Sequence, residues 1–432
     1  MDNNYLHAEV LYLEKDLRVL STVYPMQPEK TTMEKHPHLV YFVPFVFTAL
    51  SYVVFSWCNL FHTDTNSARY MLSALVQSEA AIIAIVFTLS LVAIQLTASS
   101  YSPTIIEIFR KTPDLWLLMG LYIFSIAYGL AILKIISWAM EPLLETYIVF
   151  SYFLGIFCFT TLIPYTYVMF IMLKPSTFIE KLSQKINKEE LLHTEPIQPI
   201  IDIVRRSMME YDHETAREGL DAIGEKASSI FRRERFIGDE ETNISEKVYR
   251  HFFEIGKLAL NKGDEGPVMV VIENIRKTGT TAVEKNLGIA AMKSVAFLSA
   301  IGIAAVNKNF EDISSQAIQS LTGIGIAAVK RERRTAEKVR MAEKVAASLS
   351  KISIAALRQK LEITAKVALQ GLHTVGIAAH DRGNKRTLKI VAGYLEEFEG
   401  IAFEGGTERL KMFAHELATE IREKMDNFRP HQ

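Results

Sequence analysis

The stretch SALVQSEAAIIAIVFTLSLVAIQLTASSYS, residues 73–102, decides the fold of the first half of this chain. It is long and apolar enough to cross a bilayer, because a hydrocarbon core of about 30 Å needs about 20 helical residues. Polar and small side chains recur in it at steps of three and four, which keeps them on one face of a helix. That face predicts contact with other helices or with water instead of lipid. Its members are Ser73, Gln77, Ala80, Ala81, Ala84, Thr88, Leu91, Gln95 and Ser99.

A second polar line runs along the same helix and begins at Glu79. At about 100° per residue, Glu79 lies about 200° away from Gln77, so the two do not share a face. The second line continues through Ile83, Val86, Ser90, Ala93 and Thr97. One face can line an aqueous path while the other packs on a neighbouring helix, and the sequence leaves open which face does which.

The apolar residues of the chain are concentrated before residue 175. The whole chain has 432 residues, of which 49% are hydrophobic, and its mean hydropathy is +0.13. Four runs are long enough to span a membrane, at residues 39–61, 70–98, 115–138 and 147–173. We therefore predict an all-α protein with a four-span transmembrane domain at 39–174. A leader at 1–38, with an amphipathic helix over 5–20, precedes it, and a cytosolic helical domain at 175–432 follows.

Lysine and arginine in the short loops predict the orientation. Lys15, Arg18, Lys30 and Lys35 lie in the leader, Arg110 and Lys111 follow the second run, and four lysines follow the fourth run. The loop at 139–146 has no basic residue, and the loop after the first run has one. We expect a multi-pass protein of the plasma membrane with both termini in the cytosol.

Two charged residues fall inside the predicted spans, Glu79 and Lys134. An acid within the membrane needs a partner or water. Three interpretations remain: an ion pair between the two residues, a protonated Glu79 hydrogen-bonded between helices, or a ring of carboxylates that attracts cations.

The segment SSYSPTIIEIFRK, residues 99–111, follows the inner end of the second run. Ser102 can cap a new helix and Pro103 suits its first position. A short amphipathic helix over 104–111 would include Phe109 and Arg110, and we interpret this elbow as a gating element.

Residues 86–133, VFTLSLVAIQLTASSYSPTIIEIFRKTPDLWLLMGLYIFSIAYGLAIL, resemble a known family. It is a family of predicted prokaryotic integral membrane proteins of unknown function, whose second span reads roughly SLTLVALQLASSQYSPR. The matching residues are Ser90, Leu91, Val92, Ala93, Gln95, Leu96, Ser99, Ser100, Tyr101, Ser102 and Pro103, whereas the arginine usual after the proline is Thr104 here. The resemblance implies a membrane topology and brings no established chemistry.

A short phrase recurs in the second half of the chain. It reads IGIAAV at 301–306 and 324–329, ISIAAL at 352–357, VGIAAH at 375–380 and GIAF at 400–403. Its glycine or serine stands at 302, 325, 353, 376 and 400, so the steps are 23, 28, 23 and 24 residues. Two such units approach the size of a HEAT or armadillo helical pair. We predict a stacked helical array, or a bundle made from it, with the small residues at tight helix contacts.

Catalytic patterns are absent from the sequence. It contains no HExxH, GxSxG, Walker A or GxGxxG motif, and its two cysteines make no CxxC spacing. A net charge of −1 gives no general signal for nucleic acid. We therefore expect neither an enzyme nor a cofactor, and the sequence does not identify a metal site.

The leading functional hypothesis is a homo-oligomeric ion channel that favours cations. Its partners would be other copies of the chain, the lipid bilayer, inorganic ions and a cytosolic regulator. The predicted pore-lining residues are Gln77, Ala84, Thr88, Leu91, Gln95 and Ser99, with Leu91 as an apolar constriction. The main alternative is a non-conducting scaffold or sensor that recruits a cytosolic partner through the helical array. A transporter that depends on Glu79 is a third hypothesis.

Overall fold

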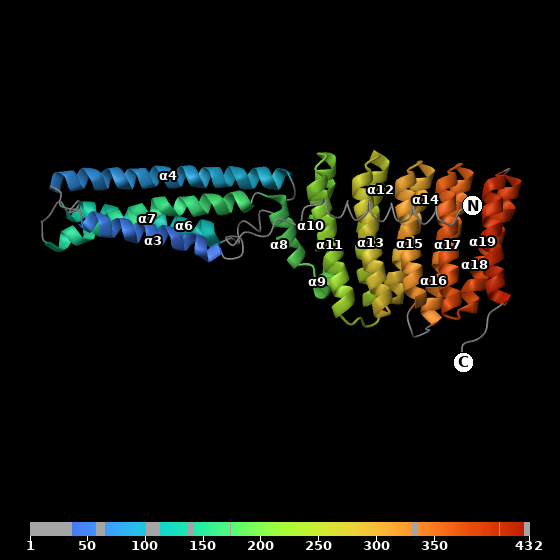
Figure 1. Cartoon of the computed structure of the whole chain (residues 1–432). Helices are drawn as coiled ribbons and strands as arrows, with labels where there is room; N and C mark the ends of the chain where they lie inside the picture. The colour runs from blue at the N-terminus through green and yellow to red at the C-terminus, as the bar shows by residue number, and fades with distance from the viewer. Residues whose placement is uncertain are drawn as a thin grey trace. The chain divides into compact units, whose positions relative to one another are not determined.

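The computed structural model describes residues 37–57, 65–100, 113–136, 142–172, 174–330, 336–405 and 407–426. These residues are almost entirely helical, and no strand occurs among them, so the predicted all-α class is confirmed. The chain divides into two compact units (Figure 1). One unit holds α3, α4 up to Val92, α6 and α7, and the other holds α8 to α19.

Four long helices contribute to the first unit: α3 (Pro37–Trp57), α4 (Thr65–Ser100) up to Val92, α6 (Pro113–Ile135) and α7 (Pro142–Met172) up to Phe170. Proline opens three of them, where its missing N–H has no helical partner to lose. Apolar windows long enough to span a membrane cover Asn66–Gln95, Leu115–Ile135 and Thr146–Ile171. In α3 the apolar stretch recorded is shorter, Pro44–Val54, although the 21-residue helix itself is about 31 Å long.

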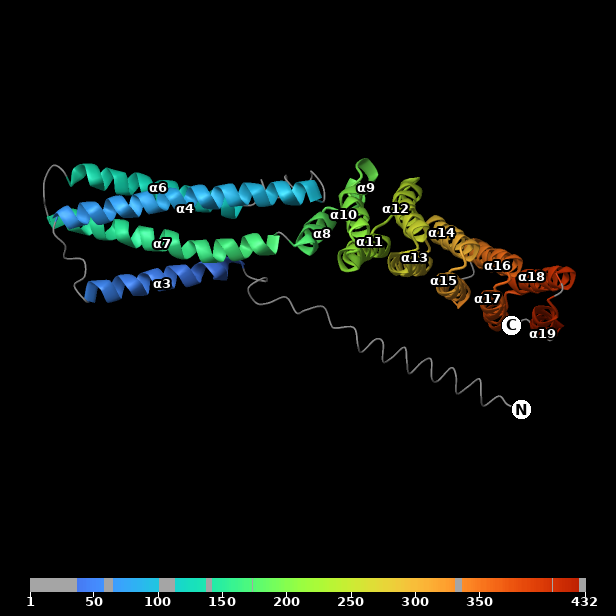
Figure 2. The ribbon, with the colours of Figure 1, turned by 90° about the horizontal axis from the view of Figure 1, so that it is seen from above.

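The second unit is an array of helices in two rows (Figure 2). In one row α11, α13, α15, α17 and α19 pack successively, and in the other α12, α14, α16 and α18 do. The unit therefore stacks as a helical repeat, as predicted. The helices are α8 (Pro175–Gln184), α9 (Lys188–His193), α10 (Gln198–Met209), α11 (His213–Arg233), α12 (Glu240–Lys262), α13 (Glu265–Lys285), α14 (Gly288–Asn307), α15 (Glu311–Lys330), α16 (Ala336–Arg358), α17 (Glu362–Asp381), α18 (Lys385–Glu404) and α19 (Glu408–Asp426).

The period of 23 residues has a local cause. Helices of 20 to 23 residues are followed by short connectors, and in five of these connectors one residue has a positive φ. These residues are Gly263, Asn286, Asn309, Lys360 and Gly383, most of them 23 positions apart. Glycine and asparagine adopt this left-handed conformation most readily at a helix C-terminus. The longer step of 28 includes residues 331–335, which lie outside the described part of the chain.

The recurring Ile-Gly pair is a contact between helices of the same row. A Cβ on Gly279 of α13 would lie 2.9 Å from Cδ1 of Ile324, the residue before Gly325 on α15. Gly302 faces Ile352 in the same way at 2.9 Å, and Gly325 faces Val375 at 3.0 Å. Each of these glycines thus packs against an apolar side chain from the next helix of its row. That apolar residue comes directly before the recurring glycine or serine of its own helix. The predicted tight packing is confirmed at these positions. It is wrong for Gly400, which is exposed and where an added Cβ would meet no neighbouring atom within 4 Å.

Helix α14 is as apolar as the membrane spans, with a window of mean hydropathy 2.0 over Gly288–Asn307. It nevertheless lies in the array and packs on α12, α13, α15 and α16. The buried share of its window is 56%, against 17–33% in α4, α6 and α7. Burial among four protein helices therefore accounts for most of its hydropathy.

Candidate functional site

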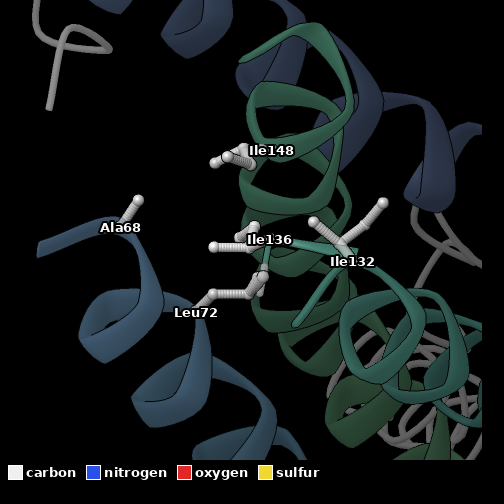
Figure 3. Packing of buried hydrophobic residues seen from close by; sticks show 5 residues of the cluster. All are labelled: Ala68, Leu72, Ile132, Ile136 and Ile148. Carbon is white, nitrogen blue, oxygen red and sulfur yellow. The ribbon is translucent and has the colours of Figure 1, made fainter. Parts of the chain in front are cut away.

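One face of α4 packs against α6 and α7. Ala68 and Leu72 of α4 join Ile132 and Ile136 from α6 and its end, and Ile148 from α7, in a cluster whose members are at most 7% exposed (Figure 3). Further along α4, Ile82, Ile83 and Val86 pack on a second cluster of Leu118, Tyr122, Cys158 and Tyr165. The face that begins at Glu79 is therefore the face that packs on α6 and α7.

Polar contacts occur within this packed face. Ser90 of α4 and Tyr165 of α7 share a hydrogen bond of 2.7 Å between their hydroxyl oxygens. The hydroxyl of Tyr122 donates to the carbonyl oxygen of Cys158 at 3.1 Å. On the other side of α7, Thr48 of α3 lies 3.1 Å from Thr160. The interior of the helix unit is thus polar at several levels, and these groups pair with one another.

Glu79 is buried in this interior, with only 1% of its surface exposed. Ser125 of α6 donates a hydrogen bond of 2.8 Å to its Oε1. Its Oε2 is buried and has no hydrogen-bond partner. Of the three interpretations of Glu79, the geometry matches a carboxyl group hydrogen-bonded between helices. A carboxylate ring open to water does not fit this burial.

The predicted pore-lining residues lie on the opposite side of α4. Gln77, Ala84, Thr88, Leu91 and Gln95 are all exposed, so the structure brings them to one face that α6 and α7 do not cover. We call this set the α4 stripe. Thr88 donates its hydroxyl to the carbonyl oxygen of Ala84 at 2.8 Å, and Gln77 donates an amide N–H to Ser73 at 3.2 Å.

The remaining predicted residues are only partly described. Ser99 belongs to α4, but its side chain is outside the described set. Lys134 is exposed in the last turn of α6. The gating residues Ser102, Pro103, Phe109 and Arg110 lie outside the described residues, as does the leader helix at 5–20.

Three residues of the packed face were missed from the sequence: Tyr122, Ser125 and Tyr165. A signal existed for α6, because Leu118, Tyr122, Ser125, Gly129 and Ile132 follow one another at steps of three and four and are all buried. In a helix that is apolar all round, however, this face does not stand out from the others.

The described residues contain no group of three or more His, Cys, Asp or Glu side chains that could hold a metal ion. In the array, burial lowers the pKa of His373 although Glu420 lies 3.0 Å away, and burial raises the pKa of Tyr249. Both groups belong to packed helices. The α4 stripe and Glu79 therefore remain the candidate sites.

Comparison with known families finds a match over one segment of the chain. Residues 37–234 match the model of a family described as "Predicted membrane protein (DUF2254)". The matched segment includes α3 to α11, so it extends on both sides of the resemblance at residues 86–133. That resemblance is confirmed over this segment, which covers less than half of the chain, and the family is described as one of predicted membrane proteins. No curated protein matches the chain.

Three solved structures are similar to the chain at low identity. A circular tandem repeat protein with novel repeat topology is 14% identical over 84% of this chain and 97% of its own, with a TM-score of 0.28. A de novo designed helical repeat protein is 15% identical over 59% and 96%, with a TM-score of 0.21. A protein described as a filament is 14% identical over 59% and 95%, with a TM-score of 0.21. The repeat character of the array rests on its own contacts.

Proposed function

We propose that this protein is the subunit of a homo-oligomeric membrane channel that favours cations, and that the α4 stripe of each subunit lines the central path. The observation that carries the proposal is the position of the stripe. Polar side chains run along the side of α4 that no other helix of the unit covers, while the opposite side is packed.

A stripe of this kind is poorly matched to lipid. The amide groups of Gln77 and Gln95 would lose hydrogen bonds to water in a hydrocarbon environment, which costs several kcal/mol for an unpaired polar group. Contact with water or with another subunit removes this penalty. Since four spans per subunit are few for a complete path, symmetry around α4 is the simplest way to form one.

Among the described residues, the interior of a single subunit offers no comparable route where α4, α6 and α7 meet, because packed side chains fill it. Leu118, Tyr122 and Cys158 are at most 2% exposed where α4, α6 and α7 meet. The path would instead run along Thr88 and the glutamines, whose oxygens suit hydrated cations. Leu91, which is 41% exposed, would form the apolar constriction. The elbow at 102–111 and the array, which we place in the cytosol, would regulate opening.

Thiol accessibility tests the assignment with a matched pair of neighbours. Thr88→Cys lies on the α4 stripe, whereas Leu89→Cys is also exposed but lies about 100° around the helix. A charged methanethiosulfonate reagent is expected to reduce the conductance of reconstituted Thr88→Cys and to leave Leu89→Cys unchanged. Equal modification of both cysteines contradicts the assignment, which places position 88 in water and position 89 in lipid.

Conductance provides the second readout in the same reconstituted system. Leu91→Asn is expected to raise the leak conductance, because a polar side chain removes the apolar constriction. If neither Leu91→Asn nor Gln95→Ala changes the conductance, the pore assignment is wrong.

A non-conducting scaffold is the second candidate function. The outward side of α14 favours it, since Ile289 is 37% exposed and Ala296 is also exposed on an otherwise apolar helix of the array. Such a surface can bind a cytosolic partner. A monomer or dimer by light scattering in detergent, with no conductance on reconstitution, favours the scaffold over the channel.

A further inference from the structure

The carboxyl group of Glu79 has an unusual environment for an acid. It lies 13 residues from one end of the apolar window 66–95 and 16 from the other, so about 20 Å of helix separates it from the nearer end. It is 1% exposed, and one of its two oxygens has no hydrogen-bond partner. We propose that Glu79 is a proton-binding site inside each subunit, where a hydrogen ion taken up from water neutralises the carboxylate between α4, α6 and α7.

The neighbours of Glu79 supply little compensation for a negative charge. Ser125 provides the one hydrogen bond recorded for the carboxyl group. The ionisable side chains that interact with it are Tyr122 and Cys158, and both would repel it if they lost a proton. The hydroxyl proton of Tyr122 is already directed at the carbonyl oxygen of Cys158. No basic side chain acts on Glu79 among the residues that the structure describes.

This environment favours the neutral acid of Glu79 over the ionised carboxylate. Moving an ionised carboxylate into an apolar interior is strongly unfavourable unless it is paired and fully hydrogen-bonded. The neutral acid avoids this penalty and keeps the contact, because its Oε1–H can donate to Oγ of Ser125 over the same 2.8 Å. Oε2 is then a carbonyl oxygen, for which a missing donor costs far less.

A proton fits this site better than a metal ion does. Hard cations in proteins take six or more oxygen ligands. Here one carboxyl group and one serine hydroxyl face each other, and Gly155 brings the backbone of α7 close, since a Cβ on it would lie 3.1 Å from Oε1. A hydrogen ion needs no further ligand and no additional volume.

Modification by dicyclohexylcarbodiimide tests the proposal on the purified full-length protein in detergent. The acid O–H adds across a C=N bond of the reagent, and the O-acylisourea then rearranges to an N-acylurea that retains all atoms of both reactants. Mass spectrometry of the digest is expected to show this adduct on the peptide that contains Glu79. Asp381 of the array, which is 65% exposed, serves as the internal control and should stay unmodified.

The pH and cation dependence of this labelling separate the possible outcomes. Labelling that falls as the pH rises, and that sodium and potassium leave unchanged, supports proton binding. Protection by either cation at constant pH overturns the proposal in favour of a bound cation, and absence of labelling at every pH overturns it in favour of a carboxylate.

Two variants keep the test independent of conductance and of folding defects. Glu79→Gln should lose both the adduct and a carboxylic C=O band in the infrared spectrum. Ser125→Ala keeps the acid but removes a hydrogen bond that is stronger to the carboxylate than to the neutral acid, so its labelling should persist to higher pH than in the parent protein. Labelling of Ser125→Ala that is lost at lower pH than in the parent contradicts the proposal.

Discussion

At the scale of single residues, glycine has two distinct roles in the array. Gly325 of α15 is buried, and a Cβ on it would lie 2.9 Å from Val345 and 3.0 Å from Val375. Gly323, two positions earlier on the same helix, is exposed and has no atom within 4 Å of such a Cβ. One glycine therefore permits close packing, whereas the other only weakens the helix.

The two glycines give a matched pair of substitutions. Gly325→Ala should lower the free energy of unfolding by about 1–3 kcal/mol, because the added methyl group overpacks the contact with α16 and α17. Gly323→Ala should raise it by about 0.5–1 kcal/mol, since alanine is the better helix former. Thermal unfolding of the full-length protein, followed by circular dichroism, measures both changes. Shifts of the same sign would contradict the packing role of Gly325.

At the scale of elements, α4 and α14 show how similar sequences acquire different environments. Both have apolar windows of mean hydropathy 2.0, yet the buried share is 17% in α4 and 56% in α14. α14 contacts helices of both rows, so protein surrounds most of it. α4 is packed along one face only, and the rest of its surface is left to lipid, water or another subunit.

Lysine substitutions in α14 distinguish a helix of the array from a membrane span. Ala296→Lys should be tolerated, with a change in unfolding free energy within about 0.5 kcal/mol, because this position is exposed. Leu298→Lys should prevent folding, because that side chain is fully buried and its charge would have no partner. Expression level and the unfolding midpoint report both effects. If α14 crossed a membrane, Ala296→Lys near its centre would instead cost about 2.5–3.5 kcal/mol.

At the scale of the whole molecule, the channel hypothesis requires that α4 of one subunit face α4 of another. Thr88 belongs to the exposed α4 stripe, and Ser90 is buried against Tyr165 of its own subunit. Position 88 therefore reports on contacts between subunits, and position 90 reports on contacts within one subunit.

Cross-linking at these positions tests the assembly. In a Cys58→Ser background, Thr88→Cys treated with a bis-maleimide in membranes should yield covalent dimers and larger species on a denaturing gel. Ser90→Cys should yield none, because its thiol is enclosed by α7. Cys158 is buried as well and should not contribute. Efficient cross-linking of Ser90→Cys but not Thr88→Cys would mean that the opposite face of α4 meets the neighbouring subunit.

The sequence by itself determined the apolar spans, the two polar lines on α4 and the period of 23 residues, because the first two depend on neighbours along one helix and the third on the spacing of helices along the chain. Its recurring phrase at 301–306 placed α14 in the array, although hydropathy alone has the same value whether a helix is surrounded by lipid or by protein. Only the tertiary structure decided that Glu79 faces Ser125, 46 residues away, and that the α4 stripe is left uncovered. The physical reason is that burial depends on which helices meet, and the helices that cover α4 are apolar on nearly every side, so the face that they use does not stand out from the others.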